Sequence, residues 1–177
     1  LICGTFGTHA LHLHYIDQVI GKRPGATVYA AMNTLMLPNR QVTLVDTHVN
    51  VAPSAEQLCE ITLLAAEELQ RFGILPKVAL VSHSNFGTSD SPSAVLLRQT
   101  LALLRERAPN LEVDGEMHGD AALDPEYRRT VMPNSTLRGE ANLTLLESVL
   151  RQEHLGRYSF LACNPSQTLS VAGSRTL

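Results

Sequence analysis

The chain has 177 residues, of which 44% are hydrophobic and 18% are charged, and its formal net charge at pH 7 is -3. This composition predicts a single globular unit with a sizeable core, and it excludes a disordered chain or a multidomain enzyme. The sequence contains neither a basic stripe for a phosphate backbone nor an apolar run near the ~20 residues of a membrane helix, so we expect no nucleic acid and no membrane as a partner.

The cysteines are few, odd in number and far apart, at Cys3, Cys59 and Cys163. This pattern favours reduced thiols over a disulfide framework or a zinc site, and we expect Cys59 to be a small core residue. The chain opens at Leu1 inside an apolar run, without the charged region of a signal peptide. We therefore interpret it as an internal fragment of a cytoplasmic protein.

The first third of the chain predicts a helix and a hairpin. Residues 1–3 are expected to end a strand, and a helix follows from His9 to Ile20, where Gly21 ends it. Two β-rich runs, Thr27–Leu37 and Gln41–Asp46, flank the turn residues Pro38-Asn39-Arg40. They predict an antiparallel hairpin.

The best-marked helix begins after Ser54. Ser54 is a predicted N-cap, Gln57 completes a capping box, and Gly73 ends the helix. The side chains at helical spacing on its apolar face are Leu58, Ile61, Ala65, Leu69 and Phe72. We expect this stripe to face the core.

Strands and helices alternate along the rest of the chain. Lys77–Val81 is a predicted strand, and a helix capped by Ser91, with Pro92 at its first position, runs to about Ala108. Three shorter elements follow: a brief strand over Leu111–Val113, a helix from Asp120 to about Arg129 and a last strand over Ala141–Leu146. The alternation predicts a mainly parallel sheet layered by helices, with the hairpin on one edge.

The segment Ser82–Pro92 is the strongest local candidate for a binding site. Its small and hydroxylated residues lie between a strand and a capped helix, where backbone N–H groups and the helix dipole favour a phosphate. The spacing is neither that of a nucleotide P-loop nor that of a Rossmann fingerprint. A polar surface loop that satisfies its own backbone is the alternative interpretation.

Two polar groups resemble metal sites, but we predict no metal at either. Asp114, Glu116 and Asp120 surround His118, yet a loop would constrain their directions little, so we favour a structural role in which Asp120 caps the next helix.

The second group consists of His9, His12 and His14. His9 and His12 share a helix face while His14 points away, which leaves no convergent third ligand. A serine hydrolase is not indicated either, because the sequence has no Gly-x-Ser-x-Gly elbow.

Three long segments, Leu11–Gly25, Ser82–Gly87 and Asp114–Ala122, resemble one family. They are similar to the phosphotransacetylase-type domain that forms the C-terminal part of large bacterial NADP-dependent malic enzymes. True phosphotransacetylases resemble the chain more loosely, and the likeness runs from Leu1 to about Leu143. It implies a three-layer α/β/α domain over residues 1–146, with a mainly parallel sheet and an antiparallel edge hairpin. Residues 147–177 are a divergent tail that we expect to be disordered.

The resemblance also implies a function. Within malic enzymes this domain would be a regulatory and oligomerising module that senses acetyl-CoA, with the malic-enzyme catalytic domain and further copies of itself as partners. The parent reaction would be the oxidative decarboxylation of malate to pyruvate. NADP and a divalent metal would bind only in that catalytic domain, so we expect no cofactor in this fragment.

We expect no catalytic residues in the fragment. In the transferases an active-site arginine aligns with His14, and their catalytic serine, arginine and aspartate lie beyond the matching region. The candidates for binding acetyl-CoA are Thr8, His14, Ser82, Ser84, Asn85, Gly87 and Thr88. The alternatives are a phosphate acetyltransferase, which transfers acetyl between acetyl phosphate and CoA, and a structural interface module without a ligand.

Overall fold

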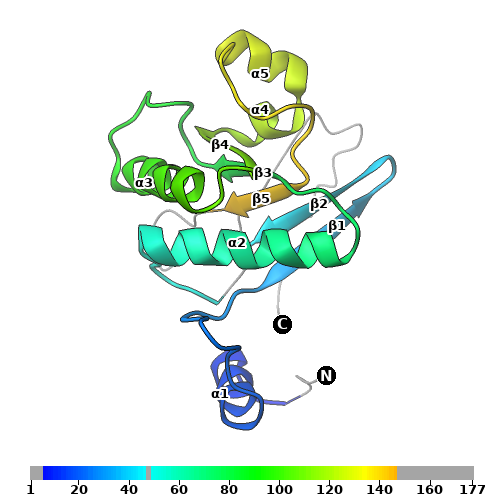
Figure 1. Ribbon diagram of the computed structural model, residues 1–177, viewed down its shortest axis with the longest axis vertical. Helices are drawn as coiled ribbons and strands as arrows, with labels where there is room; N and C mark the ends of the chain where they lie inside the picture. Colours follow the sequence, from blue (N-terminus) through cyan, green and yellow to red (C-terminus); the bar gives the residue numbers. More distant parts are fainter. Residues whose placement is uncertain (1–5, 47–48, 147–177) are drawn as a thin grey trace, which may run out of the picture.

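The fold is that of a computed structural model, which describes residues 6–46 and 49–146. The predictions for residues 1–3 and 147–177 lie outside the described residues. The described chain forms a five-stranded sheet in the order β1-β2-β5-β3-β4 (Figure 1). This order confirms the predicted mixed α/β class.

The edge hairpin consists of β1 (Met32–Leu37) and β2 (Arg40–Val45), which pair antiparallel as predicted. The first strand begins later than the sequence pattern suggested. In residues 27–31, backbone N–H groups donate to side chains instead: the Thr27 N–H donates to Glu60 and the Ala31 N–H donates to Asp46. The N–H groups of Thr27 and Ala31 are therefore satisfied without a neighbouring strand.

The other three strands are parallel. They are β3 (Lys77–Val81), β4 (Glu112–Met117) and β5 (Leu143–Leu146). The last of them in sequence, β5, lies between β2 and β3 and pairs parallel with both. The predicted mainly parallel sheet with an antiparallel edge is thus confirmed.

Two long helices, α2 (Ala55–Arg71) and α3 (Pro92–Arg107), cover one face of the sheet (Figure 1). The capping box at Ser54 is formed, and Ser91 caps α3 through the N–H of Ala94. The larger of two buried clusters fills this layer, with members that include Leu58, Ile61, Cys59, Val78, Leu80, Leu97, Leu104, Leu143 and Leu145. Burial raises the pKa of the free Cys59 thiol, as expected for a core cysteine.

On the opposite face α4 (Gly119–Leu123) packs against the sheet, and a second short helix, α5 (Pro125–Val131), packs against α4. The prediction of one helix here was wrong, because Asp124 breaks it by accepting the first N–H groups of α5, ahead of Pro125. The smaller cluster joins α4 to the sheet through Ala79, Val81, Met117, Ala121, Ala122 and Leu123. The domain therefore has three layers.

The acidic segment predicted to be a loop is a buried strand. β4 continues through Asp114 and Glu116, which are 3% and 0% exposed. Gly115 is required between them, since a Cβ there would lie 2.6 Å from the Leu80 carbonyl oxygen. The prediction failed because partners from distant segments neutralise both carboxylates.

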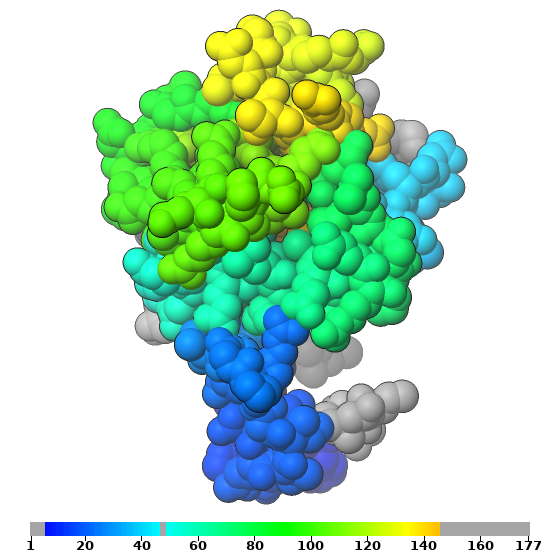
Figure 2. Space-filling model, in the orientation of Figure 1, coloured from blue at the N-terminus to red at the C-terminus, as the bar shows by residue number. Residues whose placement is uncertain are grey.

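Helix α1 (His9–Val19) forms a separate lobe below α2 (Figures 1 and 2). Thr8 caps it, and the Gly21 N–H, at a positive φ of 73°, closes its end on the Ile16 carbonyl at 3.0 Å, which confirms the predicted bounds within a residue. None of its side chains is buried. Among the described helices, α1 included, none is both long and apolar enough to cross a membrane.

Arg128 fixes the segment that leads into β5. Arg128 is 2% exposed, and its guanidinium donates to the carbonyl oxygens of Ala121, Ala122, Leu137 and Gly139. Burial lowers the pKa of this guanidinium from its ordinary value. One buried cation therefore ties residues 137–139 to α4.

Replacing Arg128 with Met should destabilise the domain by about 3 to 5 kcal/mol, because four carbonyl groups lose the guanidinium as a hydrogen-bond donor. Urea unfolding followed by circular dichroism measures this loss. Arg129→Met is the matched control, since Arg129 is exposed, and it should change stability by less than about 0.5 kcal/mol. Equal stabilities of the two variants would contradict the assigned role of Arg128.

Candidate functional site

The two sequence blocks that suggested a site meet at the carboxyl ends of β3 and β4. The Asn85 side chain joins them, because its Oδ1 accepts the His118 backbone N–H at 2.7 Å and its Nδ2 lies 3.1 Å from the His118 ring. The other ring nitrogen of His118 lies 2.8 Å from the His83 carbonyl oxygen. This edge of a parallel sheet is where α/β folds bind ligands.

Glu116 lies beneath the loop after β3 and accepts several hydrogen bonds from it and from α3. Its Oε1 accepts from the Ser84 hydroxyl at 3.1 Å, from the Gly87 N–H at 2.9 Å and from the Arg98 guanidinium at 3.0 Å. Arg98 also donates to the Ser89 carbonyl at 2.8 Å and so holds the far end of the loop. The carboxylate thus organises most of the segment between β3 and α3.

The tip of the loop adopts an unusual backbone conformation. Phe86 has a φ of 45° and Gly87 a φ of 83°. A positive φ is costly for a residue such as Phe86, and the surroundings must enforce it. Here the Phe86 N–H donates to the Glu116 carbonyl at 2.7 Å, next to the bond from Gly87 to the Glu116 side chain. Two successive N–H groups therefore converge on one residue.

The other predicted loop residues lie closer to the surface. Thr88 is exposed and accepts the Asn85 N–H at 3.2 Å, while Ser82 is half-buried beside the exposed His83. His83 Nε2 lies 3.2 Å from Ser91 Oγ, which is already the cap of α3. Polar groups of this rim, rather than those of the loop interior, face solvent.

Thr8 and His14 lie elsewhere in the fold. Both belong to the α1 lobe, at the end of the molecule opposite α4 and α5 (Figure 1). Thr8 caps the helix, and the exposed His14 ring lies 5.8 Å from the Tyr15 ring. The described residues therefore hold five predicted ligand positions together in one loop and the other two in a separate lobe.

The acidic residues of β4 are bound by protein donors. Asp114 accepts from Arg105 at 3.2 Å, from the Ser135 hydroxyl at 2.7 Å and from the Thr136 N–H at 2.8 Å. Within residues 6–46 and 49–146, no three His, Cys, Asp or Glu side chains are placed to hold a metal. The predicted cap at Asp120 was wrong, because the N-cap of α4 is His118, and the Asp120 side chain, inside the first turn, accepts the N–H of its neighbour Ala121.

Sequence reasoning missed the pairing of Arg98 with Glu116. The sequence gives little indication of this pair, because Arg98 is one of several arginines on α3 and Glu116 lies in a segment that was predicted to be a loop. The available hint was the alternation of acidic residues with apolar ones after Val113, which is typical of a strand.

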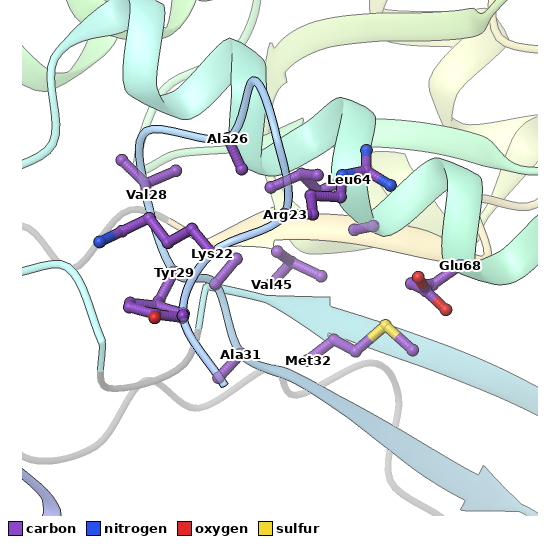
Figure 3. A pocket seen from close by; sticks show the side chains of 13 residues that line it. Lys22, Arg23, Ala26, Val28, Tyr29, Ala31, Met32, Val45, Leu64 and Glu68 are labelled. Carbon is purple, nitrogen blue, oxygen red and sulfur yellow. The ribbon is translucent and has the colours of Figure 1, made fainter. Parts of the chain in front are cut away.

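Two pockets lie away from this loop. One, of about 330 Å³, lies between residues 21–32, β2 and α2, and its walls are mainly apolar, with Val28, Met32, Val45 and Leu64 (Figure 3). The cations at its rim already have partners, Glu67 for Arg23 at 2.6 Å and Asp17 for Lys22 at 3.3 Å. The second, of about 440 Å³, lies between the C-terminal ends of α2 and α3. The loop offers more exposed polar groups for hydrogen bonds to a ligand than the apolar pocket of Figure 3 does, so we take the loop as the candidate binding site.

The hydrogen bond from Arg23 lowers the pKa of Glu67, and those from Tyr29 and Lys22 lower the pKa of Asp17. The Glu67 carboxylate thus ties Arg23 to α2, and the Asp17 carboxylate ties Lys22 and Tyr29 to α1.

Comparison with known proteins shows which proteins the chain is similar to. The chain is 52% identical over 149 residues to the NADP-dependent malic enzyme of Escherichia coli K12, and 53% identical over 143 residues to that of Haemophilus influenzae. These matches cover 84% and 81% of the chain but only 20% and 19% of the malic enzymes. The chain thus spans about a fifth of the length of these relatives.

Transferases are similar at lower identity. A phosphate acetyltransferase of Paracoccus denitrificans is 39% identical, over 79% of the chain and 46% of that protein. A phosphotransacetylase structure from Streptococcus pyogenes superposes with a TM-score of 0.74 at 28% identity, over 80% of the chain and 44% of the other. The family model described as phosphate acetyl/butaryl transferase matches residues 1–148. The chain therefore belongs to the phosphate acetyl/butaryl transferase family.

Proposed function

We propose that this chain is a regulatory region of a malic enzyme, which binds acetyl-CoA as an effector and joins copies of the polypeptide, and that it is not itself a transferase. The observation that carries the proposal is the difference in similarity. Malic enzymes are 50 to 53% identical to the chain, whereas the phosphate acetyltransferases found are 30 to 39% identical. The parent would oxidise and decarboxylate malate to pyruvate, with NADP and a divalent metal bound in its catalytic domain.

The proposed acetyl-CoA site is the rim formed by the 82–88 loop and His118. His83, Asn85 and Thr88 offer polar groups there, and the amino end of α3 adds positive potential. Asn85 couples the loop to β4, so a ligand that touches it also acts on the strand. Ligand binding at Asn85 would thereby affect the conformation of β4, and a regulatory domain requires such a difference between its bound and free states.

A phosphate acetyltransferase is the second candidate, and the family membership favours it. Two features weigh against it. The strongest donors of the loop, the Gly87 N–H and the Arg98 guanidinium, already bind Glu116. The family resemblance implies that His14 stands where the transferases have an active-site arginine, and a histidine cannot form the bidentate clamp that an arginine gives to a phosphate-like anion.

A structural interface module without a ligand is the third candidate. It is favoured by α1, which buries none of its side chains and leaves Tyr15 and Val19, as well as the preceding Phe6, largely exposed. This surface is consistent with the joining of subunits in the main proposal. A titration with acetyl-CoA separates the two.

Acetyl-CoA added to the ¹⁵N-labelled chain should move the backbone resonances of Asn85, Thr88 and His118. Asn85→Ala should weaken binding by about tenfold, because it releases His118 from the loop. Asn110→Ala is the matched control, since Asn110 is exposed beyond the other end of α3, and it should bind as the unaltered chain does. Shifts confined to the pocket of Figure 3, or none at all, would contradict this site.

The chain should not form acetyl-CoA from acetyl phosphate and CoA. Phosphoryl-type anions depend on positioned cations in the transition state, and here Arg98 is committed to Glu116. Thioester formation should equal the rate in buffer, whereas the Streptococcus pyogenes phosphotransacetylase serves as the active reference. A rate that rises in proportion to the concentration of this chain would show that the transferase alternative is right.

A further inference from the structure

Glu116 is placed under the 82–90 loop by a bulge in β4. Leu80 pairs with Gly115 and the next residue, Val81, pairs with Met117, so Glu116 has no partner in the register. Bulges of this kind redirect a side chain. The Glu116 side chain is fully buried and reaches the donors of the loop instead of a neighbouring strand.

The donors around Glu116 form an anion cradle. We use this term for the Ser84 hydroxyl, the Gly87 N–H and the Arg98 guanidinium, all of which bind Oε1. A hydroxyl, a backbone N–H and a guanidinium are the groups with which proteins hold phosphate and carboxylate ligands. In this chain the anion in the cradle comes from the protein itself.

The second oxygen of Glu116 shows that packing alone does not explain the residue. Oε2 is buried and forms no hydrogen bond with any residue in the described part of the chain. A buried carboxylate oxygen without a donor costs stability, and an apolar side chain of similar size would fill the space at lower cost. The positive φ of Phe86 adds a further cost. We infer that the negative charge on Oε1, which accepts all three hydrogen bonds of the cradle, compensates for these costs.

We propose that Glu116 is a positioning residue, the built-in anion of the loop, which fixes the 82–90 segment and keeps external phosphate out of the cradle. A phosphate-bearing ligand then meets His83, Asn85 and His118 at the rim rather than the Gly87 N–H. This consequence for the ligand rests on the proposed function. The dependence of the loop on Glu116 does not.

Glu116→Gln keeps the size of the side chain and removes its charge. In the ¹⁵N-labelled full chain, the Gly87 amide proton should move upfield and exchange about tenfold faster, because a charge-assisted hydrogen bond becomes a neutral one. Glu112→Gln is the matched control on the same strand, where Glu112 accepts the Arg138 N–H outside the cradle, and it should leave Gly87 unchanged. Equal Gly87 behaviour in both variants would overturn the proposal.

Chemical rescue tests the charge separately from packing. Glu116→Ala opens a space of carboxylate size, so acetate should raise the Tm of this variant and return the Gly87 resonance toward its original position. Acetamide, which has a similar shape and no charge, should do neither. An equal response to the two molecules would mean that Glu116 only fills space.

Inorganic phosphate is the probe for exclusion. It should leave the Gly87 resonance of the unaltered chain in place and move it in Glu116→Ala; movement in the unaltered chain would overturn the proposal. If Glu116→Ala does not fold, the proposal is tested by the Gly87 exchange rate in Glu116→Gln and by the phosphate titration of the unaltered chain. A failure of acetyl-CoA to bind the unaltered chain would remove the proposed function and leave these measurements intact.

Discussion

The sheet depends on the central position of β5. β2 and β3 do not pair with each other in the described chain; β5 lies between them and hydrogen-bonds to both. Without it the hairpin and the β3–β4 pair would be separate pieces, and Leu143 and Leu145 would leave the larger core cluster. The entry to β5 is held by Asn142, whose side chain bonds the backbone at Lys77 and Leu75. Arg128 ties down the preceding turn. The half-buried Asn142 side chain and the buried Arg128 side chain are accommodated here because each forms hydrogen bonds with backbone groups.

The same logic shapes the candidate site. The loop after β3 has the composition of an anion-binding loop, but its inward donors already hold Glu116. The outward surface is left to the polar side chains of His83, Asn85 and His118. Such a rim suits a ligand held by several hydrogen bonds better than one held by a single strong ion pair. This supports the proposed effector site over the transferase alternative.

Local signals in the sequence located most elements. The Ser54 capping box, the Ser91-Pro92 helix start and the Gly21 stop are each complete within a few residues, and the structure has all three. Predictions failed where distant contacts decide. The residues of β4 were predicted to form a loop because acidic side chains such as Asp114 and Glu116 are usually exposed. In the structure, Arg105 and Arg98 form ion pairs with them. A single helix was expected where Asp124 starts a second one, and Asp120 was expected to cap it. Thr8 and His14 were grouped with the loop through family likeness, while the fold places them on the α1 lobe.

The sequence by itself determined the helix caps, the hairpin, the alternation of strands and helices, and the family, since each rests on neighbouring residues or on contiguous motifs. Only the tertiary structure decided the strand order, the bulge at Glu116 and the occupation of the loop by that carboxylate. The physical reason is the separation along the sequence of the residues that interact. A capping bond joins residues three apart, whereas Ser84 and Glu116 are 32 residues apart. Their pairing becomes favourable only after β3 and β4 have already been brought together by burial of the apolar side chains around them.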